Sequence, residues 1–230
     1  MALIVQKFGG SSVADADRVN NVARRVTETY DAGNSVVVVV SAQGDTTDDL
    51  IEKANEINPN ASKREMDMLL SSGEQISISL LAMAIEKLGR PVISLTGWQA
   101  GFQTNAAAGN ARINRIDTER LQAELDKNNI VIVAGFQGLD KYDNITTLGR
   151  GGSDYTAALL AEALHAARVD IWTDVPGIYT TDPRVVPAAQ RIDEIAFEEA
   201  AEMATFGAKV LHPATLLPAV RSDIPVFVGS

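Results

Sequence analysis

The stretch A-L-I-V-Q-K-F-G-G-S-S, residues 2–12, starts with an apolar run and ends with a lysine, two glycines and two serines among its last residues. The apolar run predicts a short buried strand, and the glycines predict a turn that leads into a helix. Free backbone N–H groups at such a turn and at a helix N-terminus favour phosphate. Lys7 precedes the glycines, and neither a Walker A string nor a dinucleotide-binding fingerprint occurs in the chain. We therefore expect a phosphate-binding loop of another kind.

Outward from this loop, strand-like runs and helical patterns alternate to the end of the chain. Apolar or β-branched runs predict strands at residues 36–40, 92–95, 130–134, 146–148, 169–173 and 225–228. Apolar residues at helical spacing predict helices between them, beginning with residues 15–30 and 48–57. Such alternation is typical of α/β proteins. The predicted fold is a three-layer αβα sandwich with a mostly parallel central sheet.

Two helices are expected around the string S-S-G-E-Q, residues 71–75. Ser62 and Glu65 have the spacing of a capping box and predict the start of the first helix. The second is expected to begin at this string and to run over residues 73–88, with four apolar side chains along one face: Ile76, Leu80, Ala84 and Leu88. Glu74 then lies in a first helical turn, where the helix dipole stabilises a carboxylate.

The amino-acid composition limits the classes of function. The chain has 230 residues with 30 acidic and 20 basic side chains, a net charge of −10. This excess of negative charge argues against nucleic acid or an anionic membrane as a partner. Cysteine is absent, which excludes disulfides and cysteine nucleophiles. The N-terminus has no signal pattern and no apolar run approaches a membrane span, about 18 residues, so a cytoplasmic location is expected.

Four glycine-bearing loops follow predicted strands, at residues 7–12, 41–47, 135–138 and 149–154. In open α/β sheets ligands bind beyond the carboxyl ends of the strands, so these loops are expected to line one crevice. Helix capping accounts for Ser153 and Asp154 in the last loop. It does not account for Arg150 beside three glycines, which suits an arginine directed at a carboxylate or a phosphate.

Seven strings, in order along the chain, carry a resemblance to a known family. They are K-F-G-G-S-S (7–12), S-A-Q-G-D-T-T (41–47), S-G-E-Q (72–75), G-F-Q-G (135–138), T-T-L-G-R-G-G-S-D (146–154), T-D-V-P-G-I-Y-T-T-D-P-R (173–184) and G-A-K-V-L-H-P (207–213). Together they resemble the amino acid kinase superfamily, and within it the aspartokinases. The strings span the family's kinase domain from end to end.

The resemblance implies an enzyme that uses ATP to phosphorylate the side-chain carboxylate of L-aspartate, the first step towards lysine, threonine and methionine. It also implies Mg²⁺ with the nucleotide, a homodimer, a substrate lobe near residues 1–145 and a nucleotide lobe near residues 146–230. The chemistry is consistent with the absence of a nucleophile–base triad. An aspartate carboxylate has a pKa of about 4, is ionised near neutral pH and needs no general base.

The resemblance also implies a role for individual residues, and it assigns no side chains as metal ligands. Lys7, Asp154 and Lys209 are expected to be catalytic. The residues expected to bind aspartate are Ser41, Thr47, Glu74, Arg150, Gly151, Gly152 and Ser153. Those expected to bind ATP are Lys7, Phe8, Gly9, Gly10, Ser11, Thr173, Asp174, Tyr179, Arg184, Lys209 and Val210.

Some features depart from the family pattern. Gln43 stands where many aspartokinases have methionine. The first half resembles short monofunctional aspartokinases, and the chain from about Thr146 resembles the lysine-sensitive enterobacterial type, which raises the hypothesis of a chimera. ACT regulatory domains, usual in aspartokinases, have no counterpart in residues 1–230. Two alternatives stay open: a related kinase of glutamate, acetylglutamate, carbamate or UMP, and a catalytically silent scaffold.

Overall fold

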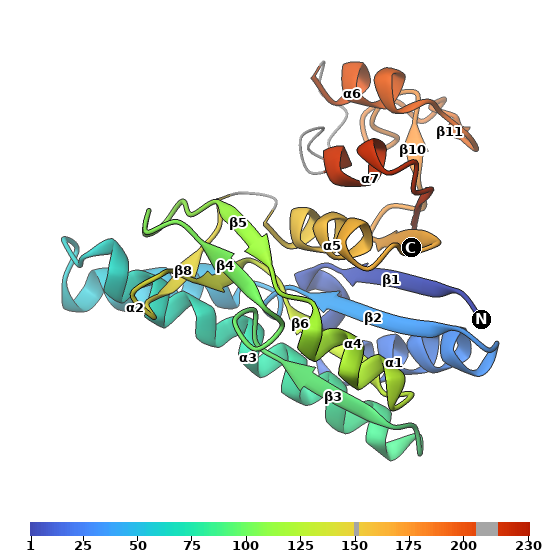
Figure 1. Cartoon of the computed structure of the whole chain (residues 1–230). Coiled ribbons are helices and arrows are strands. Elements are labelled where there is room, and N and C mark those ends of the chain that lie inside the picture. Colours follow the sequence, from blue (N-terminus) through green and yellow to red (C-terminus); the bar gives the residue numbers. More distant parts are fainter. Residues whose placement is uncertain (150–151, 206–215) are drawn as a thin grey trace.

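The centre of the molecule is a six-stranded sheet of order β12-β9-β1-β2-β6-β3 (Figure 1). The computed structural model describes residues 1–149, 152–205 and 216–230. The strands are β1 (Leu3–Phe8), β2 (Ser35–Val40), β3 (Val92–Leu95), β6 (Ile130–Ala134), β9 (Arg168–Trp172) and β12 (Val226–Gly229). All neighbouring pairs are parallel. The predicted strand positions and the parallel sheet are therefore confirmed.

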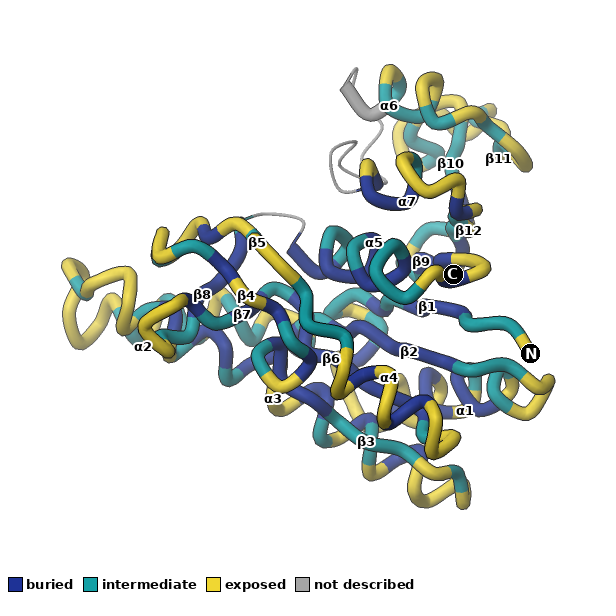
Figure 2. Tube along the Cα trace, viewed as in Figure 1, coloured by how far each residue is buried: buried dark blue, intermediate teal, exposed yellow. Residues whose placement is uncertain are grey.

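Helices cover both faces of this sheet, as the three-layer prediction requires. Strand β2 shows why, because its valines alternate between two hydrophobic cores. Val36, Val38 and Val40 pack with α1 (Ala16–Asp31) and α3 (Lys63–Lys87). Val37 and Val39 pack in the core that holds α4 (Glu119–Asp126), α5 (Gly152–Ala163) and α7 (Leu217–Arg221). Figure 2 shows the burial concentrated in the central strands.

A second sheet of order β5-β4-β7-β8 lies beside α3, and most of it was not predicted (Figure 1). Its strands are β4 (Phe102–Thr104), β5 (Ile113–Ile116), β7 (Gln137–Leu139) and β8 (Ile145–Thr147), of which only β8 was expected. The turn after residue 173 contains a further hairpin of β10 (Ile178–Tyr179) and β11 (Arg191–Ile192), followed by α6 (Phe197–Thr205). These strands have two to four residues. Runs this short carry no readable period, so their pairing depends on tertiary contacts.

Helix α3 is continuous from Lys63 to Lys87, and the predicted helix start at residues 71–75 is wrong. Its N-cap is confirmed, because the Ser62 side chain accepts a hydrogen bond from the Glu65 backbone at 3.3 Å. Gly73 lies inside the helix and costs it about 1 kcal/mol relative to alanine. A Cβ on Gly73 would lie 2.9 Å from the Ala42 Cβ, so glycine permits close approach of the 41–47 loop. Glu74 is consequently in mid-helix, and the helix-dipole interpretation is also wrong.

The faces of α3 also differ from the expected arrangement. Ile76, Leu80 and Leu88 are 49%, 39% and 42% exposed, whereas Asp67 and Glu74 are buried. Among the described residues, α3 is the one helix whose length and composition would allow it to cross a membrane, with a mean hydropathy of 1.4 over 18 residues. Half of that window is buried inside the protein. Burial of two carboxylates against the rest of the chain favours a core helix.

Helix α2 (Thr46–Ile57) follows the second glycine loop directly and packs on α3. A short 3-10 helix η1 (Gly10–Val13) connects the first glycine loop to α1. Asp15 caps α1 by accepting a hydrogen bond from the Arg18 backbone at 2.9 Å. The Asp15 cap thus fixes the start of the helix that follows the loop after β1.

Candidate active site

The glycine loops after β1 and β2 touch each other at the carboxyl edge of the sheet. The Gly44 backbone N–H donates to the Gly10 carbonyl at 2.9 Å. A Cβ on Gly10 would lie 2.5 Å from the Ala42 carbonyl oxygen, so no larger residue fits. Gly44 has φ +46°, a left-handed conformation that glycine adopts without strain. The two loops therefore form one continuous wall.

The loops after β6 and β8 form the facing wall. The Leu148 backbone donates to the Phe136 carbonyl at 2.8 Å. A Cβ on Gly135 would lie 2.6 Å from the Ser153 Oγ, and one on Gly152 would lie 2.9 Å from the Phe136 ring. Glycine at both positions lets the two loops approach. The expectation that the four loops line one crevice is confirmed for their described residues.

Between the walls lies a cavity of about 280 Å³, which we call the central cavity. Its size suits a small polar metabolite. Residues from all four loops and from α3 line it: Lys7, Gly10, Ser41, Ala42, Gly44, Thr47, Glu74, Phe136, Gly149, Gly152, Ser153 and Asp154. The structure thus brings together eight of the predicted site residues, namely Lys7, Gly10, Ser41, Thr47, Glu74, Gly152, Ser153 and Asp154.

Lys7 and Asp154 form an ion pair in the central cavity, with Nζ and Oδ1 2.8 Å apart. Their side chains are 13% and 17% exposed, so both stay accessible from the cavity. Lys7 comes from the end of β1 and Asp154 from the first turn of α5, where the helix dipole stabilises a carboxylate. A Cβ on Gly9 would lie 3.6 Å from the Lys7 Nζ, so the ammonium lies close to the first glycine loop.

Glu74 is a second carboxylate in the cavity lining, and it is only 3% exposed. Its Oε1 accepts a hydrogen bond from the Ala42 backbone at 3.3 Å, and its Oε2 has no hydrogen-bond partner among the described residues. Burial raises the pKa of Glu74 to about 7, against the smaller effect of its backbone hydrogen bonds. A buried carboxylate oxygen without a partner is costly. A cation bound in the cavity would remove that cost.

Gln43 does not line the central cavity, although it lies in the second glycine loop. Its side-chain amide donates to the Val13 carbonyl at 2.7 Å. This bond connects the 41–47 loop to the end of η1. The Gln43 side chain therefore connects the loop after β2 to the segment after β1 and stabilises the wall that the two loops form.

A second hollow of about 250 Å³ lies beyond the ends of β1 and β9. The strand order reverses direction at β1, because β2 lies on one side of it and β9 on the other. In open α/β sheets ligands bind at such a point. The predicted nucleotide residues that line it are Phe8, Ser11, Thr173 and Asp174. Tyr179 and Arg184 are not among its lining residues. Arg184 pairs with Asp182 at 2.9 Å, and Asp182, with a smaller contribution from Asp174, raises the pKa of the guanidinium.

Four predicted site residues lie outside the described part of the chain: Arg150, Gly151, Lys209 and Val210. Four residues that line the central cavity were not predicted as site residues, namely Ala42, Gly44, Phe136 and Gly149. A further polar residue on α3 was also missed. Asp67, on α3, accepts hydrogen bonds from Thr147 and Gly109. The helical spacing between positions 67 and 74, about two turns, was the available signal that Asp67 shares a face with Glu74.

Comparison with known proteins agrees with this geometry. Residues 2–230 match the amino acid kinase family. The chain belongs to the amino acid kinase family. An aspartokinase of Geobacillus stearothermophilus is 55% identical over 230 residues, which make up all of this chain and 56% of that protein. This amino acid kinase chain thus spans about half the length of the curated relatives it matches.

Solved structures agree with the fold of this amino acid kinase. The aspartate kinase of Synechocystis has a TM-score of 0.87 and 49% identity, covering 100% of this chain and 38% of that one. E. coli aspartokinase III in complex with aspartate and ADP has a TM-score of 0.89 and 44% identity. That match covers 99% of this chain and 62% of the other.

Proposed function

We propose that this amino acid kinase transfers the γ-phosphoryl group of ATP to the side-chain carboxylate of L-aspartate, forming 4-phospho-L-aspartate. The central cavity carries the proposal, because its lining includes both the Lys7 ammonium and the Glu74 carboxylate, one oxygen of which has no partner among the described residues. Aspartate offers an ammonium for Glu74 and a carboxylate near Lys7. The similar E. coli enzyme, which binds aspartate and ADP, supports the same pair of ligands.

The reaction needs charge neutralisation and positioning more than proton transfer. An ionised carboxylate oxygen of aspartate forms a bond to the γ-phosphorus, and the bond from that phosphorus to the bridging oxygen of ADP breaks. The electron pair leaves with ADP, and no proton has to move. Lys7 stabilises the charge that develops on the transferring group, and Asp154 holds the lysine in place. Gly9, Gly10 and Ser11 supply backbone and hydroxyl donors to the phosphates.

Ser41 and Thr47 line the cavity near Glu74 and would hydrogen-bond the aspartate backbone groups. Gly152 and Ser153 would approach its carboxylates from the facing wall. By resemblance, Arg150 and Gly151 complete this substrate set. Phe8, Thr173 and Asp174 would hold the nucleotide in the second hollow, with Tyr179, Arg184, Lys209 and Val210 added by resemblance. The resemblance implies a substrate lobe near residues 1–145 and a nucleotide lobe near residues 146–230, and residues from both ranges line each of the two hollows.

Mg²⁺ bound with ATP would neutralise phosphate charge during transfer. Within the described residues no group of three or more His, Cys, Asp or Glu side chains is arranged to hold a metal ion. Asp154 is a partly exposed carboxylate in the cavity lining, and it would accept a hydrogen bond from a water molecule bound to the metal. We infer that phosphate oxygens and water provide most of the coordination.

We also propose a homodimer in the cytoplasm. The support for self-association is the outer face of α3, where Ile76, Leu80 and Met83 are 49%, 39% and 61% exposed. Three apolar side chains at helical spacing form a stripe that a second copy could cover. Sedimentation analysis of the parent protein and of Leu80→Glu tests this, because a monomeric parent would contradict the proposal.

The activity is tested by measuring ADP release from Mg·ATP with and without L-aspartate. Hydroxylamine in the same reaction should convert an acyl phosphate product into aspartyl hydroxamate. Parallel assays with glutamate, acetylglutamate, carbamate and UMP separate the related kinases. Turnover with one of these but not with aspartate would leave only the superfamily assignment. Absence of turnover with all of them would favour the scaffold.

A further inference from the structure

Asp67 is a buried carboxylate whose hydrogen bonds come from two different loops. It lies on α3 and is 1% exposed. Its Oδ1 accepts from the Thr147 hydroxyl at 2.6 Å, and its Oδ2 accepts from the backbones of Thr147 at 3.1 Å and Gly109 at 2.9 Å. In the described part of the chain these donors satisfy the carboxylate without an ion pair. Charge-assisted bonds of this kind are among the stronger ones in proteins.

The two loops that Asp67 binds are also attached to each other. Gly109 belongs to the connection between β4 and β5, and Thr147 ends β8 just before the glycine loop at residues 148–154. The Ala111 backbone donates to the Thr147 carbonyl at 3.0 Å. A Cβ on Gly149 would lie 2.8 Å from the Asn110 Oδ1. Asp67 therefore holds the hydroxyl and the backbone N–H of Thr147, and Ala111 holds its carbonyl.

The face of α3 that carries Asp67 also carries Glu74. Between them, the Ser71 carbonyl accepts a hydrogen bond from the side chain of the fully buried Gln137 at 3.1 Å. Gln137 in turn accepts from the Gly97 backbone at 3.2 Å. Positions 67, 71 and 74 share one helical face. Helix α3 is thus a common support for the acidic wall of the central cavity and for the loops that face it.

We propose that Asp67 is a positioning residue for the amino-acid substrate. It does not line the cavity, but it sets where the described residues of the glycine loop after β8 lie relative to Glu74. Gly149, Gly152 and Ser153 of that loop line the cavity opposite Glu74, so a shift of the loop changes the space for an amino acid. The identity of this substrate as aspartate rests on the proposed function. The nucleotide residues at the second hollow are attached to β1 and β9 and are independent of Asp67.

Asp67→Asn tests the proposal, since it keeps the shape but removes the negative charge from all three hydrogen bonds and places an amide N–H₂ where the Thr147 hydroxyl now donates to a carboxylate oxygen. The KM for aspartate should rise by about tenfold, which corresponds to about 1.4 kcal/mol and to one impaired buried hydrogen bond. The KM for ATP should stay within about twofold of the parent. Thr147→Val should act in the same direction and Thr147→Ser, which keeps the hydroxyl, should restore the parent KM. The Thr147 pair provides a test if Asp67→Asn does not fold.

Glu124→Gln is the matched control. Glu124 is 5% exposed and is hydrogen-bonded by Asn129 and Arg120, but it lies on α4, away from the cavity. The Glu124→Gln variant should have a lower free energy of unfolding than the parent and an unchanged KM for aspartate. An equal rise of that KM in both variants would show general destabilisation and overturn the proposal. So would an unchanged aspartate KM in a folded Asp67→Asn protein.

Amide hydrogen exchange provides a readout that does not depend on turnover. The amides of Gly109 and Thr147 donate to the buried carboxylate, so Asp67→Asn should accelerate exchange in segments 105–111 and 145–149. Glu124→Gln should not. Unchanged exchange in these segments overturns the positioning role. If the parent protein phosphorylates another acceptor instead of aspartate, the proposed function fails and the KM comparison is made with that acceptor.

Discussion

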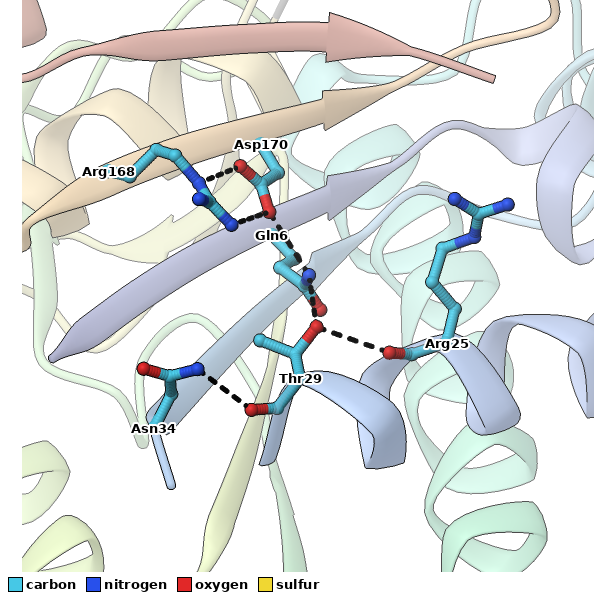
Figure 3. Close-up of polar contacts among 6 residues, drawn as sticks. All are labelled: Gln6, Arg25, Thr29, Asn34, Arg168 and Asp170. Carbon is cyan, nitrogen blue, oxygen red and sulfur yellow. Dashed lines mark hydrogen bonds and ion pairs between the residues drawn. The ribbon is translucent and has the colours of Figure 1, made fainter. Parts of the chain in front are cut away.

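The polar network between α1 and the β1–β9 pair contrasts with the central cavity, which lies beyond the carboxyl end of β1. Each region contains a carboxylate that is nearly inaccessible: Asp170 is 2% exposed and Glu74 is 3% exposed. In the network, Arg168 contacts Asp170 through Nε at 2.6 Å and Nη2 at 3.2 Å (Figure 3). Gln6 donates to Asp170 at 3.2 Å. In the cavity, one oxygen of Glu74 has a single weak backbone donor and the other has none.

The network continues from the sheet into α1. The Gln6 amide also lies 3.0 Å from the Thr29 hydroxyl, and Asn34 donates to the Thr29 carbonyl at 3.0 Å (Figure 3). These contacts hold α1 against the sheet, so the polar groups there serve the fold. Glu74, in contrast, has one oxygen without a partner among the described residues, and this oxygen is available to a ligand. Burial alone therefore does not distinguish the two carboxylates, whereas the missing partner inside a cavity does, and it motivates the proposed role of Glu74.

The largest effect is expected from Lys7→Met, which removes a positive charge from the lining of the central cavity. Losing one electrostatic donor to a transition state costs about 2.7–4 kcal/mol, so kcat should fall by about a hundredfold to a thousandfold. Steady-state rates of the parent and the variant measure this, and melting temperatures confirm that both are folded. A kcat within about threefold of the parent would remove Lys7 from the mechanism.

Glu74→Gln should weaken aspartate binding while leaving the KM for ATP unchanged. The expected loss is about 1.5–3 kcal/mol, the contribution of a hydrogen bond to a charged group. The variant should not be less stable than the parent at pH 8, because it removes a buried carboxylate with an unpartnered oxygen. Separate KM measurements and urea unfolding test both parts. A destabilised variant with an unchanged aspartate KM would make Glu74 a structural residue like Asp170.

Asp170→Asn should show the opposite pattern. Removing the charge weakens two contacts to Arg168, so the free energy of unfolding should fall by about 1–3 kcal/mol. The KM values for aspartate and ATP should both stay unchanged. Urea unfolding and steady-state kinetics provide the two readouts. Unaltered stability would mean that the network does not hold α1 in place.

The smallest effect is a pH dependence from Glu74. The pKa of Glu74 lies near 7 in the empty site, so the ionised form that binds an ammonium is lost as pH falls through 7. The KM for aspartate should therefore rise by about tenfold between pH 8 and pH 6, about 1.4 kcal/mol. Glu74→Gln is the control. In this variant the KM for aspartate should no longer depend on pH in this range, and the pH dependence of the KM for ATP should be the same as in the parent. A parallel pH profile in the two proteins would assign the titration to another group.

The same shift affects stability in a direction that can be measured. The folded protein holds a proton on Glu74 that the unfolded chain releases near its usual pKa of 4.5. The stability contributed by this group is present below pH 4.5 and is lost as pH rises through about 7. Relative to Glu74→Gln, the parent should therefore lose stability between pH 5 and pH 8 without ligand, and aspartate should restore it.

The sequence predicted the central sheet and the glycine loops because both depend on local patterns. Five consecutive valines, at positions 36–40, predict a buried strand in any α/β context. Glycines after predicted strands, such as Gly10 and Gly152, indicate close approach of backbone to a neighbour. The position of Gly73 could not be interpreted in this way. Within a helix glycine usually marks an end, and only contact with Ala42 explains its place in the interior.

The sequence by itself determined the layer order, the sheet edge that holds the site, and the charged residues available there. Tertiary structure alone decided that Glu74 lies in mid-helix without a full set of partners, and that α3 directs its apolar stripe outward. It also decided that Asp67 binds Thr147 and Gly109, which lie far from it in the chain. The physical reason is range: strands, turns and caps follow from neighbours in sequence, whereas burial and hydrogen-bond satisfaction depend on segments that meet only in the folded state.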